Sequence, residues 1–263
     1  VGIDNYSLFP LKLSPMEVLQ WAVENGAEGV AFSGLEVEHQ QLIDDAYLKD
    51  LLDYAKSHDL YLEWGGAQHV PRDLTTWSKK DISDINRRVA EEASKLETHI
   101  VRSCSGGLMR WNDDAPMTET LLKEMADFLR SQRQMLMDYG VVLAIETHFE
   151  FTTYELLKVF EYCGAEPGEY LGICLDTMNL LTMLENPVWA TDRVLPWIVS
   201  THIKDGGLTI TPEGMRSFVT ELGKGAIYFR KILKRLSLLP WEIHLSIEDH
   251  GGDFFLPIFD PLF

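Results

Sequence analysis

The chain has 263 residues, 46% of them apolar, and its 41 acidic and 23 basic residues give a net charge of −18. This composition supplies enough apolar side chains for a sizeable core, which excludes a disordered or low-complexity chain. A strongly acidic surface repels phosphate, so we expect neither nucleic acid nor an anionic membrane as a partner. A small molecule and a metal cation fit the charge better, and a homo-oligomer is compatible with the sequence.

The cysteines Cys104, Cys163 and Cys174 are odd in number, lie far apart and share no C-x-x-C spacing. We therefore expect no disulfide framework and no cysteine zinc site, and we expect the reducing cytoplasm as the location. No apolar run approaches the roughly 18 residues that cross a membrane. The first residues lack the basic flank and long apolar stretch of a signal peptide.

Short apolar runs alternate with amphipathic stretches along the whole chain. The predicted strands are residues 1–5, 28–33, 59–64, 99–104, 141–147, 171–176, 197–203 and 242–248. The predicted helices are residues 15–25, 45–58, 80–96, 117–139, 153–163, 187–195 and 226–237. In the longest of them, Leu121, Leu122, Met125 and Leu129 recur at steps of three and four, which is the spacing of a core-facing helix.

Eight strands that alternate with helices indicate parallel βαβ units in an α/β protein. The simplest closure is one (β/α)8 barrel, a TIM barrel, over residues 1–263, because such a barrel commonly takes about 250 residues. A doubly wound open sheet is the alternative that strand counting leaves open. No helical pattern follows the strand at 242–248, so the last barrel helix is expected to be missing or atypical.

Four ionisable side chains fall at the carboxyl ends of the last four predicted strands, namely Glu146, Asp176, His202 and Glu248. Strand side chains alternate between faces, and the apolar residues before each of these positions predict that all four point into the barrel mouth, where such barrels have their active sites. Three converging carboxylates repel one another unless a cation compensates them. The sequence therefore predicts a site for one divalent metal ion, Mn²⁺ or Mg²⁺, with Co²⁺ and Zn²⁺ as alternatives.

Small side chains stand two residues before each of the four. They are Ala144, Cys174, Ser200 and Ser246. Because they point inward as well, we expect them to leave room for the floor of a pocket.

The region of residues 141–250 resembles the sugar phosphate isomerase/epimerase superfamily, the xylose isomerase-like TIM barrels of the AP endonuclease family 2 type. The motifs that carry the resemblance are, in the superfamily's order, Glu146-Thr147-His148, Asp176-Thr177-Met178-Asn179, His202-Ile203-Lys204-Asp205, Leu222-Gly223-Lys224-Gly225 and Ile247-Glu248. The resemblance implies a metal held by Glu146, Asp176, His202 and Glu248. It also implies that Glu146 and Glu248 are catalytic: one removes the proton beside a carbonyl, and the other returns it to the opposite face of an enediolate.

Two positions depart from the pattern of the superfamily's ketose epimerases. Asn179 stands where these enzymes usually carry a His, and residues 205–208 lack the Arg that usually follows the metal-binding His. Endonuclease IV, the member that acts on nucleic acid, also has a His at the position of Asn179. With a net charge of −18 as well, the sequence argues against a nuclease.

Four further side chains are predicted to contact the substrate, namely His148, Lys204, Arg102 and Glu63. His148 and Lys204 each lie two residues after a predicted ligand and share its inward face, and Lys204 suits a carboxylate, phosphate or enolate oxygen. Arg102 and Glu63 fall late in the fourth and third strands, within reach of substrate hydroxyls. The alternative for each is a structural role in the core or in an ion pair.

The sequence thus favours a metal-dependent isomerase or epimerase that acts on a small sugar, polyol or keto-acid through an enediolate. The first alternative is a metal-dependent lyase, a dehydratase or decarboxylase of a keto-sugar acid, which Lys204 and the missing epimerase residues favour. The second alternative is a non-catalytic, ligand-binding barrel, which would require a broken metal site.

Overall fold

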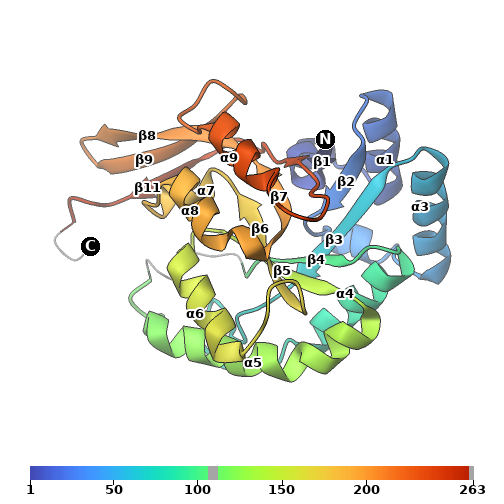
Figure 1. Ribbon diagram of the computed structural model, residues 1–263, viewed down its shortest axis with the longest axis horizontal. Helices are drawn as coiled ribbons and strands as arrows, with labels where there is room; N and C mark the ends of the chain where they lie inside the picture. The colour runs from blue at the N-terminus through green and yellow to red at the C-terminus, as the bar shows by residue number, and fades with distance from the viewer. Residues whose placement is uncertain (106–111, 261–263) are drawn as a thin grey trace.

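In residues 1–105 and 112–260, which this computed structural model describes, eight parallel strands pair around a closed barrel in the order β1-β10-β7-β6-β5-β4-β3-β2 (Figure 1). The barrel strands are β1 (Gly2–Asp4), β2 (Gly29–Phe32), β3 (Tyr61–Ala67), β4 (Ile100–Ser103), β5 (Val142–Glu146), β6 (Leu171–Asp176), β7 (Ile198–Ile203) and β10 (Ser246–Ile247). The TIM barrel is therefore confirmed, and the doubly wound sheet is excluded.

Helices surround the barrel, as Figure 1 shows. They are α1 (Pro15–Glu24), α2 (Val37–Gln40), α3 (Asp45–Ser57), α4 (Ser83–Lys95), α5 (Thr118–Tyr139), α6 (Thr153–Cys163), α7 (Asn179–Thr182), α8 (Pro187–Val194) and α9 (Phe229–Leu236), with short 3-10 helices η1 (Asn5–Leu11) and η3 (Leu195–Trp197). Local chemistry sets their ends: before α6, the backbone N–H of Thr152 donates to Glu155 while the N–H of Glu155 donates back to the Thr152 hydroxyl. None of the described helices has both the length and the apolar character needed to cross a lipid bilayer.

The core lies between the helices and the outer face of the barrel. Leu122, Met125 and Leu129 of α5 are buried, and so are Leu143 and Ile145 of β5. These side chains belong to one continuous apolar cluster that extends to the other helices and strands. The three- and four-residue spacing seen in the sequence of α5 therefore marks its core-facing side.

The last barrel strand is much shorter than the predicted strand 242–248, because only Ser246 and Ile247 pair with their neighbours. Its partner β1 has three residues before the chain turns into η1, so the ladder between them has room for few pairs. His244 lies below this ladder, where its ring stacks on Tyr61 with 3.7 Å between ring centroids.

The space beneath the polar strand ends is filled by side chains and does not form a pocket floor, contrary to the expectation from the small residues. The Tyr61 hydroxyl lies 2.9 Å from the Ser246 hydroxyl, and Ser200 donates a 2.5 Å hydrogen bond to Glu63. The other oxygen of Glu63 lies 2.8 Å from His244 Nδ1. The small residues of β7 and β10 thus make room for larger side chains of β3.

A second, antiparallel sheet was not predicted. It consists of β8 (Asp205–Thr211), β9 (Gly214–Thr220) and β11 (Asp253–Leu256) in the order β11-β9-β8, and it lies beside the barrel at the upper left of Figure 1. Strand β11 occupies the region after β10 in which an eighth barrel helix would begin. Within the described residues no helix follows β10, in agreement with the sequence pattern.

Asp205 connects this sheet to the loop before α9. Its buried carboxylate accepts hydrogen bonds from the backbone N–H groups of Gly223 (2.8 Å), Gly225 (3.0 Å) and Ile227 (3.2 Å). A Cβ atom at Gly225 would collide with the same carboxylate. This contact explains why the His-x-Lys-Asp and Gly-x-Gly motifs occur together in one chain.

We expect Asp205→Ala to lower the free energy of unfolding by about 3 kcal/mol, because it leaves buried N–H groups without an acceptor. Urea unfolding of the full chain measures the change. Asp53→Ala is the control, because within the described residues the Asp53 side chain forms an exposed ion pair with Lys49 and no other, and its loss should leave stability nearly unchanged. Equal effects of the two substitutions would show that Asp205 does not organise the loop.

Candidate metal centre and pocket

The four predicted ligands meet at the carboxyl edge of the barrel. Glu146, Asp176 and His202 come from β5, β6 and β7, and Glu248 follows β10 directly. One ligand atom from each lies within 4.8 Å of the others. All four side chains are buried, so the sequence-based prediction that they converge is matched by the geometry.

Three of the atoms that face one another in this cluster make no hydrogen bond within the described residues, although two of them, both oxygens, form ion pairs with Lys204. His202 Nδ1 lies 3.3 Å from Glu146 Oε1 and 3.4 Å from Glu248 Oε2. Within the described residues, His202 Nδ1, Asp176 Oδ2 and Glu248 Oε2 are buried without a hydrogen bond. Buried polar atoms are rarely left in this way. Oxygen atoms and one imidazole nitrogen form a donor set that suits a divalent cation, so these residues fit a metal ion.

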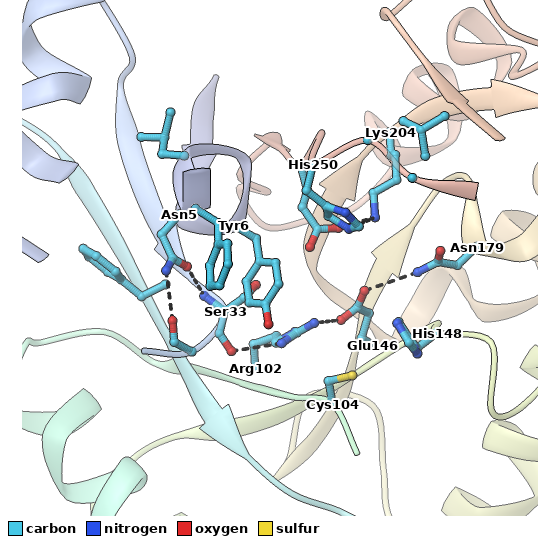
Figure 2. Close-up of a pocket in the computed structure, with 18 of the residues that line it drawn as sticks. Asn5, Tyr6, Ser33, Arg102, Cys104, Glu146, His148, Asn179, Lys204 and His250 are labelled. Carbon is cyan, nitrogen blue, oxygen red and sulfur yellow. Dashed lines mark hydrogen bonds and ion pairs between the residues drawn. The ribbon is translucent and has the colours of Figure 1, made fainter. Parts of the chain in front are cut away.

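Two permanent cations adjoin the carboxylates. Lys204 Nζ lies 2.5 Å from Glu248 Oε2 and 3.1 Å from Asp176 Oδ2. Arg102 forms an ion pair with Glu146 and donates a 2.9 Å hydrogen bond to the backbone carbonyl of Ser33 (Figure 2). Both residues therefore form ion pairs, which is the structural alternative given for them above, and both also line the pocket.

The pKa values of the carboxyl groups follow from burial and these charges. Burial opposes ionisation of Glu146, but Arg102 and His202 outweigh it and hold the pKa of Glu146 well below its usual range. For Glu248, burial is likewise outweighed by His202 and Lys204, and its pKa is lowered. Burial dominates at Asp176 and raises its pKa in spite of Lys204. Positive charge on Arg102, Lys204 and His202 thus favours the ionised form of both glutamates, which is the form that a metal ligand takes.

Backbone groups orient Asp176. Its Oδ1 accepts hydrogen bonds from the N–H groups of Met178 and Asn179, both at 2.7 Å, and this leaves Oδ2 facing the other ligands. The amide of Asn179 lies 3.4 Å from Glu146 Oε1. Asn179, which replaces the usual epimerase His, therefore contacts a predicted ligand and lines the pocket.

Asp4 at the end of β1 is a site residue that the sequence reasoning missed. Its carboxylate is fully buried, accepts a 2.6 Å hydrogen bond from Ser33 and lies 3.4 Å from His202 Nε2. The signal was present, because Asp4 lies one residue before the end of the predicted strand 1–5. A strand of three residues, however, shows no alternation from which an inward direction could be inferred.

Two members of the cluster, Glu146 and Glu248, line a cavity of about 580 Å³, within the usual range of about 300–1,000 Å³ for small-molecule sites. Arg102 and Lys204 line it beside them, and Figure 2 shows Arg102, Glu146 and Lys204 among its polar side chains. Its walls include aromatic side chains from four segments, which are Tyr6 and Phe9 of η1, Phe32 of β2, Phe149 after β5 and Phe254 of β11. The antiparallel sheet also contributes Ser217 and Val219, so it forms part of the binding pocket.

The structure brings three of the four predicted substrate contacts to this pocket. Arg102, Lys204 and His148 line it, and His148 Nδ1 lies 2.8 Å from Glu150 Oε1. Glu63 does not line it. Strand β3 continues to Ala67, three residues past its predicted end, so Glu63 lies well below the strand end and contacts Ser200 and His244.

A second group of metal-ligating side chains lies beside the pocket. Cys104, His148 and Glu150 also bring ligand atoms within 4.8 Å of one another. In the described residues, however, the buried side-chain atoms without hydrogen bonds include three from the first group and none from the second. The first group is therefore the stronger candidate for the metal.

Comparison with known proteins agrees with the barrel fold. A family model described as xylose isomerase-like TIM barrel matches residues 19–257. A search of curated proteins finds no sequence match.

Solved structures share the fold at low sequence identity. The probable 3-DHS dehydratase AsbF from Bacillus anthracis has a TM-score of 0.71 at 17% identity, over 95% of this chain and 92% of that one. A D-tagatose 3-epimerase-like protein has a TM-score of 0.72 at 16% identity, over 95% and 91%. The IOLI protein, solved with a zinc atom, has a TM-score of 0.70 at 18% identity, over 95% and 88%.

Removal of the lysine charge should destabilise the metal-free chain. In the presence of a chelator, we expect Lys204→Met to lower the free energy of unfolding by about 3–5 kcal/mol, because Asp176 and Glu248 lose their shared cation in a buried place. Urea unfolding gives the value. Lys158→Met removes a more exposed lysine that pairs with Glu119, so it should have little effect. A Lys204 variant as stable as the wild type would contradict the electrostatic account.

Proposed function

Since the chain belongs to the xylose isomerase-like TIM barrel family, we propose that it is an enzyme that binds one divalent metal ion through Glu146, Asp176, His202 and Glu248. We propose Mn²⁺ or Mg²⁺ as the ion and isomerisation or epimerisation of a small sugar, polyol or keto-acid as the reaction. The observation that carries the proposal is the buried four-residue cluster, two members of which line a ligand-sized cavity. When bound, such an ion supplies Lewis-acid stabilisation of negative charge on a substrate oxygen.

Glu146 and Glu248 are the proposed acid/base pair. They reach the cavity from β5 and from the end of β10, which are separated in the barrel by β6 and β7. Carboxylates that approach from two positions can face opposite sides of a planar enediolate. One glutamate, in its ionised form, would accept the proton from carbon, and the other, carrying a proton, would donate that proton to the opposite face.

The remaining polar groups would hold the substrate. Arg102 and Lys204 are donors that line the pocket, and His148 adds a ring nitrogen from the loop after β5. The aromatic walls suit the C–H faces of a carbohydrate-like molecule. These groups would fix the reacting carbon next to the two glutamates.

The second candidate function is that of a metal-dependent lyase, a dehydratase or decarboxylase of a keto-sugar acid. Lys204, between Asp176 and Glu248, is placed to contact a substrate carboxylate or a leaving oxygen. The structural likeness to a probable dehydratase supports this candidate as well, at the level of the fold.

The test is a panel of ketoses and keto-sugar acids incubated with the chain in D₂O with Mn²⁺ or Mg²⁺. An epimerase or isomerase incorporates deuterium at carbon and conserves the rest of the substrate mass, whereas a lyase releases water or CO₂. We expect Glu146→Gln and Glu248→Gln each to lower kcat by about 10²–10⁴-fold.

The control for this test is Glu92→Gln. Glu92 lies on α4, outside the barrel, and within the described residues its side chain accepts one hydrogen bond, from Trp64 Nε1. This variant should keep wild-type activity. Full activity in both of the glutamate variants, on a substrate that the wild type converts, would refute the proposed acid/base pair.

A further inference from the structure

The two ring nitrogens of His202 lie in different surroundings. Nδ1 faces Glu146 and Glu248 and has no hydrogen bond within the described residues. Nε2 faces the other way, 3.4 Å from Asp4 Oδ2 and 3.3 Å from the Ser33 hydroxyl. A neutral imidazole can bind a cation only through the nitrogen that carries no hydrogen, so the partner of the opposite nitrogen decides which one is available.

Asp4 is fully buried, and each of its two carboxylate oxygens accepts a hydrogen bond. Its Oδ1 accepts from the backbone N–H of Tyr6 at 2.9 Å, which caps η1. Its Oδ2 accepts from Ser33 at 2.6 Å and is left with capacity for a further donor. The two oxygens therefore have separate tasks, because one shapes the local backbone and the other faces the histidine.

We propose that Asp4 is a positioning residue that keeps the hydrogen of His202 on Nε2 and so directs the lone pair of Nδ1 toward the metal. This inference rests on the proposed metal site. Asp4 lies before residues 19–257, the part of the chain that the family model matches, so the match does not assign it a role. A carboxylate behind a metal-binding histidine orients the ring and strengthens it as a ligand.

Asp4→Asn is the most selective variant. The asparagine carbonyl can still cap Tyr6, but its amide would donate toward Nε2, which favours the tautomer with the hydrogen on Nδ1 and blocks the ligand. We expect the dissociation constant for Zn²⁺ or Mn²⁺, measured by competition with a chelator, to rise about 10–100-fold. The thermal midpoint in excess chelator should stay close to that of the wild type.

Two further variants separate positioning from packing. Asp4→Ala removes the acceptor without imposing a tautomer, so it should lower stability more than Asp4→Asn but weaken metal binding less. Glu63→Gln alters another buried carboxylate paired with a histidine, His244, which is not a proposed ligand. Its metal affinity should equal that of the wild type.

A direct measurement uses ¹⁵N NMR of the zinc-loaded wild-type chain, which should show His202 with its hydrogen on Nε2. Three results would overturn the inference. The first is a His202 ring with its hydrogen on Nδ1, and the second is wild-type metal affinity in Asp4→Asn. The third is a metal affinity that falls in proportion to the loss of thermal stability across the variants. A wild-type chain that binds neither Zn²⁺ nor Mn²⁺ would instead overturn the proposed metal site itself, and this inference with it.

Discussion

Three carboxylates that must share one buried place in the barrel are the constraint on which the rest of the site depends. Glu146, Asp176 and Glu248 have ligand atoms within 4.8 Å of one another and of His202. Mutual repulsion at this separation and burial would disrupt the site without positive charge nearby. Arg102 and Lys204 supply part of that charge. His202 Nδ1, Asp176 Oδ2 and Glu248 Oε2 make no hydrogen bond within the described residues, and this donor set accounts for the fit to a divalent cation.

The residues around the cluster orient the side chains that form it. Backbone N–H groups of α7 hold one oxygen of Asp176, Arg102 holds Glu146, and Asp4 faces the rear nitrogen of His202. One layer lower, Glu63 and its partners fill the barrel interior. Such surrounding contacts would hold the proposed ligands in place before a substrate binds, and this preorganisation is what electrostatic stabilisation of a reaction requires.

Much of this architecture could be predicted from the sequence, because the barrel repeats one strongly patterned unit. Periodicity located the helices, and polar residues that end apolar strands located the four proposed ligands. Predictions failed where local pattern was weak. The sheet of β8, β9 and β11 was not predicted. Glu63 was predicted too close to the carboxyl end of its strand, because β3 extends to Ala67. Asp4 was missed because a three-residue strand reveals no direction.

The proposed binding of one metal ion by Glu146, Asp176, His202 and Glu248 can be tested by anomalous diffraction from crystals of the chain grown with Mn²⁺. We expect one strong anomalous peak per chain, about 2.0–2.4 Å from an oxygen of each carboxylate and from Nδ1 of His202. No peak among these four residues in the manganese-grown crystals, or a peak confined to another part of the chain, would contradict it.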